Sequence, residues 1–253
     1  MKNSAICSEM QIQNQQAKRQ LGVYYLTVLI CCFPGIILFV MKGYNESFLW
    51  LNGFHHPILD VLMPHLTHIG EGAFLTAIFA LLMRKKQPAV VVSLAVSMLL
   101  VLVIISPLKH QIFEMWARPL AYFKKETFHY VALRDWHANA FPSGHSAAAA
   151  CILAYFALVS QKEKWAVLIA LIAVFAAYTR VYIGVHFLGD ILVGVGVGML
   201  ISATVFVLIY ARLLRYFEKL SKESFHKWQI FFQLAAALTI VISLYELIRT
   251  YYI

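Results

Sequence analysis

The sequence predicts an all-α fold, a polytopic bundle of about six to seven transmembrane helices. Hydrophobic residues make up 61% of the 253 residues and charged residues only 13%, whereas a soluble domain carries about 25% charged residues. Apolar runs also follow one another from residue 22 to residue 250, and about 20 apolar residues are enough to cross the hydrocarbon core of a bilayer. Such a chain cannot cover a soluble surface of ordinary polarity.

The polar and glutamine-rich residues 1–21 are expected to form a cytoplasmic N-terminal segment. A membrane-embedded domain is expected over 22–227, and an additional C-terminal transmembrane helix over 228–253. Residues 42–56 are aromatic-rich and predict a loop at the membrane interface. The predicted spans cover residues 22–41, 57–83, 88–107, 143–160, 165–183, 189–210 and 228–248.

The second run is unusual because its first part is polar. It carries Asp60, His65, His68 and Glu71, so this part is expected to be interfacial or buried in protein. Structural hydrogen bonding is the preferred interpretation of the two histidines and Glu71, with substrate contact as the alternative. In the sixth run, Gly194 and Gly198 have a spacing that is typical of close helix packing.

The net charge is +9, which in a soluble protein would favour nucleic-acid binding. Here the basic residues cluster at the ends of apolar runs, where topology signals lie. The densest clusters fall in short loops on the side of the N-terminus. The positive-inside rule therefore predicts that the N-terminus is cytoplasmic and, with seven spans, that the C-terminus is outside.

Three groups of polar residues lie near span ends, and all three fall on the outer side of this topology. A function at that face would explain why basic residues occur there against the charge bias. The groups are Lys109 with Arg118, after the third span; Ser143, Gly144 and His145, which open the fourth; and Arg180, His186 and Asp190, which join the fifth and sixth.

The three cations of these groups suit a phosphate, because a guanidinium fork matches phosphate oxygens. Ser143 and Gly144 follow Pro142, a residue that suits the first turn of a helix. A helix start offers free N–H groups and a positive dipole end to an anion. Phosphate is the simplest ligand that satisfies all of these donors.

The two histidines and the carboxylate suggest chemistry on that phosphate. His186 and Asp190 are four residues apart, so both can lie on one helical face. The carboxylate can hold one ring nitrogen protonated and leave the other free to attack phosphorus. His145 is placed to protonate the leaving group. The inferred reaction has two steps, in which a phosphohistidine forms and water then releases phosphate.

The three motifs resemble the tripartite signature of the type 2 phosphatidic acid phosphatase superfamily, in its bacterial membrane branch. They are Lys109…Arg118-Pro119, Pro142-Ser143-Gly144-His145, and Arg180-(five residues)-His186-(three residues)-Asp190. The resemblance implies that no metal or other cofactor is required. It also implies a phosphate site formed by Lys109, Arg118, Ser143, Gly144 and Arg180, with His186 as nucleophile, Asp190 as its partner and His145 as the acid.

The sequence departs from the family pattern in two places. Eight residues separate Lys109 from Arg118, where the family usually has six. Either the helix end carries a longer turn or Lys109 is not the phosphate ligand. Thr179 precedes Arg180 where the family usually has serine, which preserves the hydroxyl. The loop 120–141, with His129, Trp136 and His137, is expected to cover the site.

The resemblance predicts an integral membrane lipid phosphatase that acts at the periplasmic face of a bacterial inner membrane. We place undecaprenyl diphosphate first as substrate, with undecaprenyl phosphate as product. The alternatives are the 1- or 4′-phosphate of lipid A and phosphatidylglycerol phosphate. Alternatives of other classes are a vanadium haloperoxidase-like enzyme and an anion transporter. The expected partners are the lipid substrate and the bilayer, with no nucleic acid and no obligate protein partner.

Overall fold

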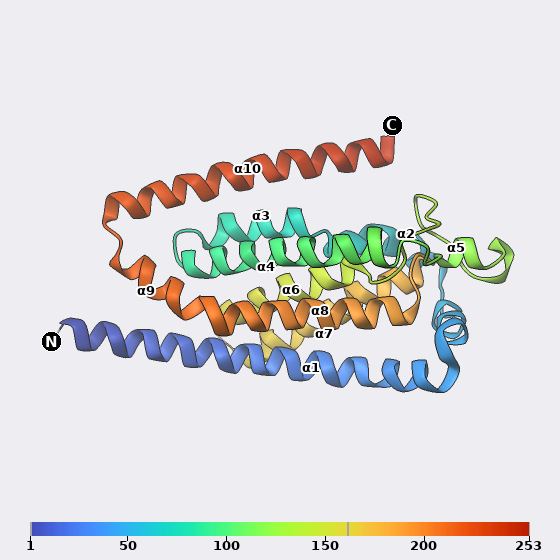
Figure 1. The fold of residues 1–253 in the computed structure, drawn as a ribbon, viewed down its shortest axis with the longest axis horizontal. Helices are drawn as coiled ribbons and strands as arrows, with labels where there is room; N and C mark the ends of the chain where they lie inside the picture. The colour runs from blue at the N-terminus through green and yellow to red at the C-terminus, as the bar shows by residue number, and fades with distance from the viewer. Residues whose placement is uncertain (1, 161, 253) are drawn as a thin grey trace.

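The computed structural model describes residues 2–160 and 162–252, and every regular element in these ranges is helical. The long helices lie side by side along one axis, with α2 and α5 at one end of the bundle and the N-terminus at the other (Figure 1). Five helices are long and apolar enough to cross a membrane, and a bent pair can supply a sixth. The shorter apolar helix Gly144–Val159 lies among them. The predicted bundle of about six to seven helices is confirmed.

Helix α1 (Lys2–Asn52) continues through the predicted division after residue 21 and through most of the predicted loop 42–56. The prediction of a loop is therefore wrong as far as Asn52. The chain instead turns at Gly43, whose φ of 73° and ψ of −174° interrupt the helix. A positive φ is easily adopted by glycine alone. The turn directs the end of α1 over the end of the bundle (Figure 1).

The second apolar run is bent. Helix α2 (Pro57–Leu66) continues into the 3-10 turn Thr67–Gly70, and α3 (Gly72–Met83) follows at an angle of 63°. Helix α2 begins at a proline after His56, whose Nδ1 accepts a hydrogen bond from the backbone N–H of Ile58 at 3.2 Å. The bend agrees with the expectation that the polar first part is interfacial or buried in protein, because α2 is not continuous with α3.

The centre of the bundle is α6 (Gly144–Val159), which packs against α1, α3, α4, α7 and α8. Its alanines allow this because short side chains let neighbouring backbones approach. The remaining elements are α4 (Pro88–Pro107), the π-turn Leu108–Ile112, α5 (Pro119–Tyr122), the 3-10 turn Lys125–Thr127, α7 (Glu163–Tyr182), α8 (Leu188–Val205), the π-turn Phe206–Tyr210, α9 (Ala211–Lys219) and α10 (Lys222–Tyr252).

Two glycines of α8 determine how closely it packs on α6. A Cβ at Gly194 would overlap the carbonyl oxygen of Ser143, and a Cβ at Gly198 would overlap that of Ala147. The close packing that the glycine spacing predicted is confirmed. Because Ser143 caps α6, the same contact positions the start of α6 beside the start of α8.

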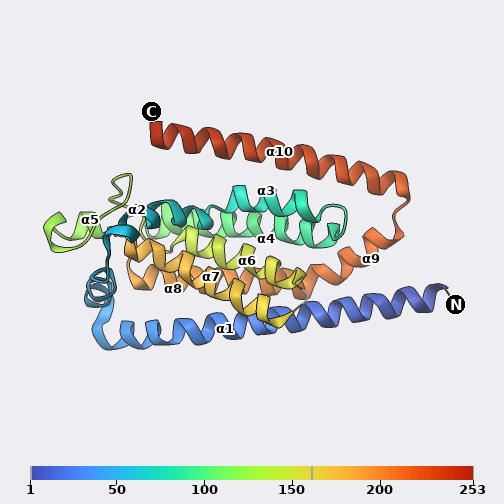
Figure 2. The ribbon, with the colours of Figure 1, turned by 180° about the vertical axis from the view of Figure 1, so that it is seen from behind.

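Helix α10 lies on the outside of the bundle and packs against α3 (Figure 2). It begins at Lys222 rather than at residue 228. The domain boundaries that the sequence predicted after residues 21 and 227 coincide with no helix end in the described ranges. The C-terminal end of α10 lies toward the α2 end of the bundle, away from the N-terminus (Figure 1). This arrangement agrees with termini on opposite sides of a membrane.

Candidate active site

The three motifs predicted from the sequence meet at the α2 and α5 end of the bundle. The first follows α4, the second caps α6, and the third joins α7 to α8. At its centre His186 and Asp190 are both buried, with side chains that are 1% and 0% exposed. His186 Nδ1 donates to Asp190 Oδ2 at 3.1 Å. In a neutral ring this donation leaves Nε2 without a proton.

Asp190 accepts hydrogen bonds from three groups. Besides His186, the backbone N–H of Phe187 donates to Oδ2 at 3.0 Å, and the hydroxyl of Tyr44 donates to Oδ1. The prediction that the pair lies on one helical face is wrong. Phe187 is the N-cap of α8, so His186 precedes the helix and Asp190 reaches back across its first turn.

Arg118 lies on the other side of the His186 ring and is 4% exposed. Its Nη1 lies 3.4 Å from His186 Nε2 and donates to the carbonyl of Val185 at 3.2 Å. Its Nε donates to the carbonyl of Ala138 at 2.8 Å, and Trp136 covers the guanidinium at 4.9 Å. Burial lowers the pKa of Arg118 to about 10, so the group stays charged at neutral pH.

Arg180 is 5% exposed and comes from the last turn of α7. Its Nη1 donates to the hydroxyl of Thr67 at 2.8 Å. Its buried Nε has no hydrogen-bond partner among the described residues. A buried donor without a partner costs about 1–3 kcal/mol. Arg180 therefore carries a donor that an oxygen of a bound anion can satisfy.

The second motif caps α6. Ser143 is the N-cap, and its hydroxyl oxygen accepts from the N–H and the hydroxyl of Ser146 at 3.4 and 2.9 Å. Its own N–H donates to the carbonyl of Asp190 at 3.0 Å. Pro142 thus precedes the cap. The expectation that Pro142 lies in the first turn of the helix is wrong. The helix begins at Gly144, which lines a cavity together with His145.

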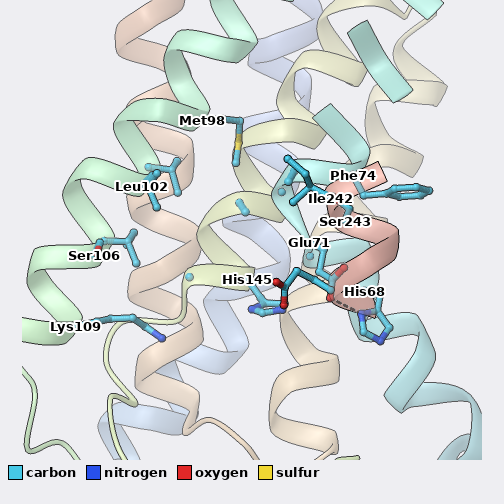
Figure 3. Close-up of a pocket in the computed structure, with 18 of the residues that line it drawn as sticks. His68, Glu71, Phe74, Met98, Leu102, Ser106, Lys109, His145, Ile242 and Ser243 are labelled. Atoms are coloured by element: carbon cyan, nitrogen blue, oxygen red, sulfur yellow. Dashed lines mark hydrogen bonds and ion pairs between the residues drawn. The ribbon is translucent and has the colours of Figure 1, made fainter. Parts of the chain in front are cut away.

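Lys109 lines the same cavity as His145, and both side chains are seen there in Figure 3. The long spacing between Lys109 and Arg118 has a structural explanation. A π-turn over Leu108–Ile112 prolongs α4 before the chain turns. The helix end therefore carries a longer turn, as one of the two alternatives has it, and the role of Lys109 as a phosphate ligand stays a prediction.

Burial lowers the pKa of His186 well below its usual value, and the nearby cations Arg118, Lys109 and Arg180 lower it further. The ring is therefore neutral at pH 7. Desolvation and positive neighbours both disfavour the imidazolium form. His186 is thus in the protonation state that a nucleophile needs.

The structure adds three residues that the sequence did not indicate. Tyr44 and Thr67 contact Asp190 and Arg180 as described above. Asn52 is 1% exposed and donates to the carbonyls of Val181 and Tyr182 at 3.0 and 3.1 Å. Polar residues inside or beside apolar runs were the only signal that could have identified them.

The pair His68 and Glu71 borders the site. His68 Nδ1 and Glu71 Oε1 are 2.6 Å apart, and both residues line the cavity beside His145 (Figure 3). This contact agrees with the preferred interpretation, structural hydrogen bonding. Because both residues line the cavity, contact with the substrate stays an alternative.

Comparison with known proteins identifies the family. Residues 90–214 match the model of the PAP2 superfamily. The chain belongs to this superfamily. The matched range contains all three motifs, from Lys109 to Asp190. The family predicted from the motifs is confirmed.

Two relatives of this PAP2 protein are named phosphatases. Phosphatidylglycerophosphatase B of Bacillus subtilis is 28% identical over 160 residues, which cover 57% of this chain and 72% of the relative. Lipid A 4′-phosphatase of Porphyromonas gingivalis is 25% identical over 180 residues, which cover 69% of this chain and 76% of the relative. The predicted enzyme class, a membrane lipid phosphatase, is confirmed.

Two crystal structures are similar to this PAP2 protein. LpxE of Aquifex aeolicus has a TM-score of 0.58 and 26% identity, over 65% of this chain and 94% of that one. A transmembrane PAP2-type phosphatidylglycerolphosphate phosphatase of Bacillus subtilis has a TM-score of 0.50 and 24% identity, over 78% and 98%. The second likeness supports the fold alone.

Proposed function

We propose that this PAP2 protein removes a phosphate group from a membrane lipid through a phosphohistidine at His186. The observation that carries the proposal is that three motif residues, Lys109, Gly144 and His145, line one apolar cavity. The cavity has a volume of about 550 Å³, which lies in the range of about 300–1,000 Å³ for ligand sites. A charged head and an apolar tail would be bound in one continuous space.

The cavity lies between α3, α4, α6 and α10. Along α4 it extends from Lys109 past Ser106 and Leu102 to Met98 (Figure 3). Lys109 follows Met98 by eleven positions, which corresponds to about 16 Å at 1.5 Å per residue, or roughly half of the hydrocarbon thickness. A lipid tail fits such a space better than a soluble phosphate ester does.

The phosphate would lie between His186 Nε2 and the surrounding donors. Arg180 offers its buried Nε, and Arg118 already faces His186. Lys109 adds a third charge, and Gly144 opens the N-terminus of α6, where N–H groups favour an anion. Ser143 acts mainly by capping α6, since its hydroxyl oxygen is already bonded to Ser146. Its hydroxyl hydrogen can still donate to phosphate.

The proposed reaction has two steps. His186 Nε2 attacks phosphorus, the bond from phosphorus to the lipid oxygen breaks, and His145 gives that oxygen a proton. Asp190 stabilises the ring through Nδ1. Water then attacks the phosphohistidine, His145 takes a proton from it, and phosphate leaves. His145 thus starts protonated, loses its proton to the lipid oxygen and regains one from water, so the two steps together consume one water and restore the enzyme.

The substrate is proposed from the relatives. One relative is named for phosphatidylglycerophosphate and the other for the 4′-phosphate of lipid A, so we now place a lipid phosphomonoester first. Undecaprenyl diphosphate, which the sequence analysis placed first, becomes the alternative. We also propose that the site faces the outer leaflet of a bacterial inner membrane, as the charge distribution of the loops predicts.

Phosphate release by the purified protein in mixed micelles tests the proposal. The substrates are phosphatidylglycerol phosphate, lipid A and undecaprenyl diphosphate. We expect turnover of a monoester, acid-labile label on His186 with ³²P substrate, and neither in His186→Ala. The variant His226→Ala, at the other end of the bundle, should keep both. Turnover by His186→Ala would overturn the mechanism, and turnover of undecaprenyl diphosphate alone would overturn the choice of substrate.

A further inference from the structure

A second cluster of ligating side chains lies at the same end of the bundle but outside the phosphate site. It consists of His55, between α1 and α2; Asp60, on α2; and His129, in the loop 120–141. One ligand atom from each residue lies within 4.8 Å of the other two. We propose that these three residues bind a divalent transition-metal ion, with Zn²⁺ the best match.

The donor set suits zinc. Two imidazoles and one carboxylate, with water in the fourth position, form a common zinc site. Asp60 Oδ1 and His129 Nε2 are already 2.9 Å apart. Ligands bound at 2.0–2.2 Å in a tetrahedron lie about 3.3 Å from one another, so these two need to move little. His55 is exposed, and its ring would turn out of its stack on His129 to complete the site.

The surrounding groups hold two of the three ligands in place. The hydroxyl of Tyr182 donates to Asp60 Oδ1 at 2.6 Å. The backbone of His129 is bonded on both sides to Asn52, whose Oδ1 accepts from its N–H at 2.7 Å and whose Nδ2 donates to its carbonyl at 2.9 Å. Such outer contacts orient metal ligands and raise affinity for the ion.

The rings of the two histidines lie against each other. The rings of His55 and His129 are stacked, with centroids 4.0 Å apart and planes 6° apart. The stacking keeps both rings within reach of the Asp60 carboxylate, so the three ligand atoms stay close together. The side chains of His129 and Asp60 are 25% and 23% exposed, so an ion can reach them from water.

The site would link the chain between α1 and α2 to the loop that covers Arg118. That loop supplies the carbonyl of Ala138, which accepts from Arg118 Nε, and the ring of Trp136 over the guanidinium. A bound ion would therefore stabilise the loop without entering the reaction. Binding to the folded state alone raises stability as the free ion concentration exceeds its Kd.

Zinc binding to the full-length protein, stripped of metal with EDTA, tests the proposal. Isothermal titration should give one Zn²⁺ per chain, and zinc should raise the unfolding temperature. His55→Ala, at an exposed position, should weaken binding at least about 10-fold. Asp60→Asn should do the same while it keeps an acceptor for Tyr182. His137→Ala, an exposed histidine of the same loop, should bind as the wild type does.

The absence of saturable binding by the wild type would overturn the proposal. Equal affinity in His55→Ala and His137→Ala would overturn it as well, since zinc would then bind elsewhere. The titration involves no turnover, so its outcome is independent of the proposed lipid phosphatase mechanism.

Discussion

The Nε2 atom of His186 lies 3.4 Å from the guanidinium of Arg118, while Nδ1 of the same ring contacts Asp190 at 3.1 Å. The two nitrogens of one imidazole thus face opposite charges. The carboxylate fixes which nitrogen carries the proton, and the guanidinium disfavours a second proton. A nucleophile that stays neutral beside cations follows from this arrangement.

The activity of the enzyme should depend on pH through His186. Because the pKa of His186 is lowered, the neutral ring persists to lower pH and is lost only as pH falls through the lowered value. The acid limb of kcat/KM should therefore lie below the ordinary histidine pKa of about 6.5. Arg118→Gln should move this limb to higher pH, because one cation is removed. Profiles of kcat/KM for the free enzyme report this pKa, and coincident acid limbs in the two proteins would contradict the argument.

Arg180→Lys tests the donor that lacks a protein partner. Lysine keeps the charge but loses the planar fork, so Nε can no longer meet a phosphate oxygen. We expect kcat/KM to fall by about 10²–10³, the usual cost of one preorganised donor. Arg212→Lys on α9, at the other end of the bundle, is the matched control. Equal kinetics in the two variants would show that Arg180 does not bind the reacting group.

Gly198→Ala should destabilise the bundle by about 1–3 kcal/mol, the usual cost of overpacking. The new methyl group would overlap the carbonyl oxygen of Ala147 on α6. Gly196→Ala, two residues earlier on the same helix, has nothing within 4 Å of its Cβ and should be neutral. Thermal inactivation of the two variants measures the difference, and a shared midpoint would rule out this packing argument.

Asn52→Ala should also be destabilising. The side chain bonds to backbone atoms of His129, Val181 and Tyr182, and each buried group left unpaired costs about 1–3 kcal/mol. The half-buried Asn45 makes one hydrogen bond within the described part of the chain, to the hydroxyl of Tyr122 at 2.9 Å, so Asn45→Ala should change little. Unfolding temperatures of both variants check the prediction, which fails if Asn45→Ala is the less stable.

Leu102→Trp tests the path of the lipid tail. Leu102 lines the cavity, so a larger side chain there should lower kcat/KM for a long-chain lipid phosphate by about tenfold, equivalent to about 1.4 kcal/mol. A short-chain analogue should be affected less. Leu99 lies on the same helix, is 59% exposed and does not line the cavity, so Leu99→Trp is the control. Equal effects on long and short chains would contradict the proposed tail path.

Much of the site could be predicted because its chemistry follows from short motifs. Arg118, Arg180, His186 and Asp190 are separated by sequence intervals that the family pattern specifies, and the structure brings them together. The number of helices was predictable for a different reason, since a span needs a continuous apolar run. Neither signal depends on contacts between distant parts of the chain.

The sequence did not reveal features that depend on such contacts. Thr67 and Asn52 act on residues more than a hundred positions away, and no local pattern marks them. The segment 42–56 reads as a loop because its aromatic residues suit an interface. In the structure Tyr44 and Phe48 pack on Phe187, with ring centroids 4.5 and 5.2 Å from that of Phe187, and this packing favours a helix.

The cavity between α3, α4, α6 and α10 would determine which substrate concentration governs the rate. If the tail enters from the bilayer, the enzyme meets its substrate in two dimensions, and the relevant concentration is molecules per lipid area. Adding inert detergent would slow turnover at constant bulk molarity, whereas diluting micelles of fixed composition would not. Saturation would then be expressed as a mole fraction, and the membrane itself would set the working range of the enzyme.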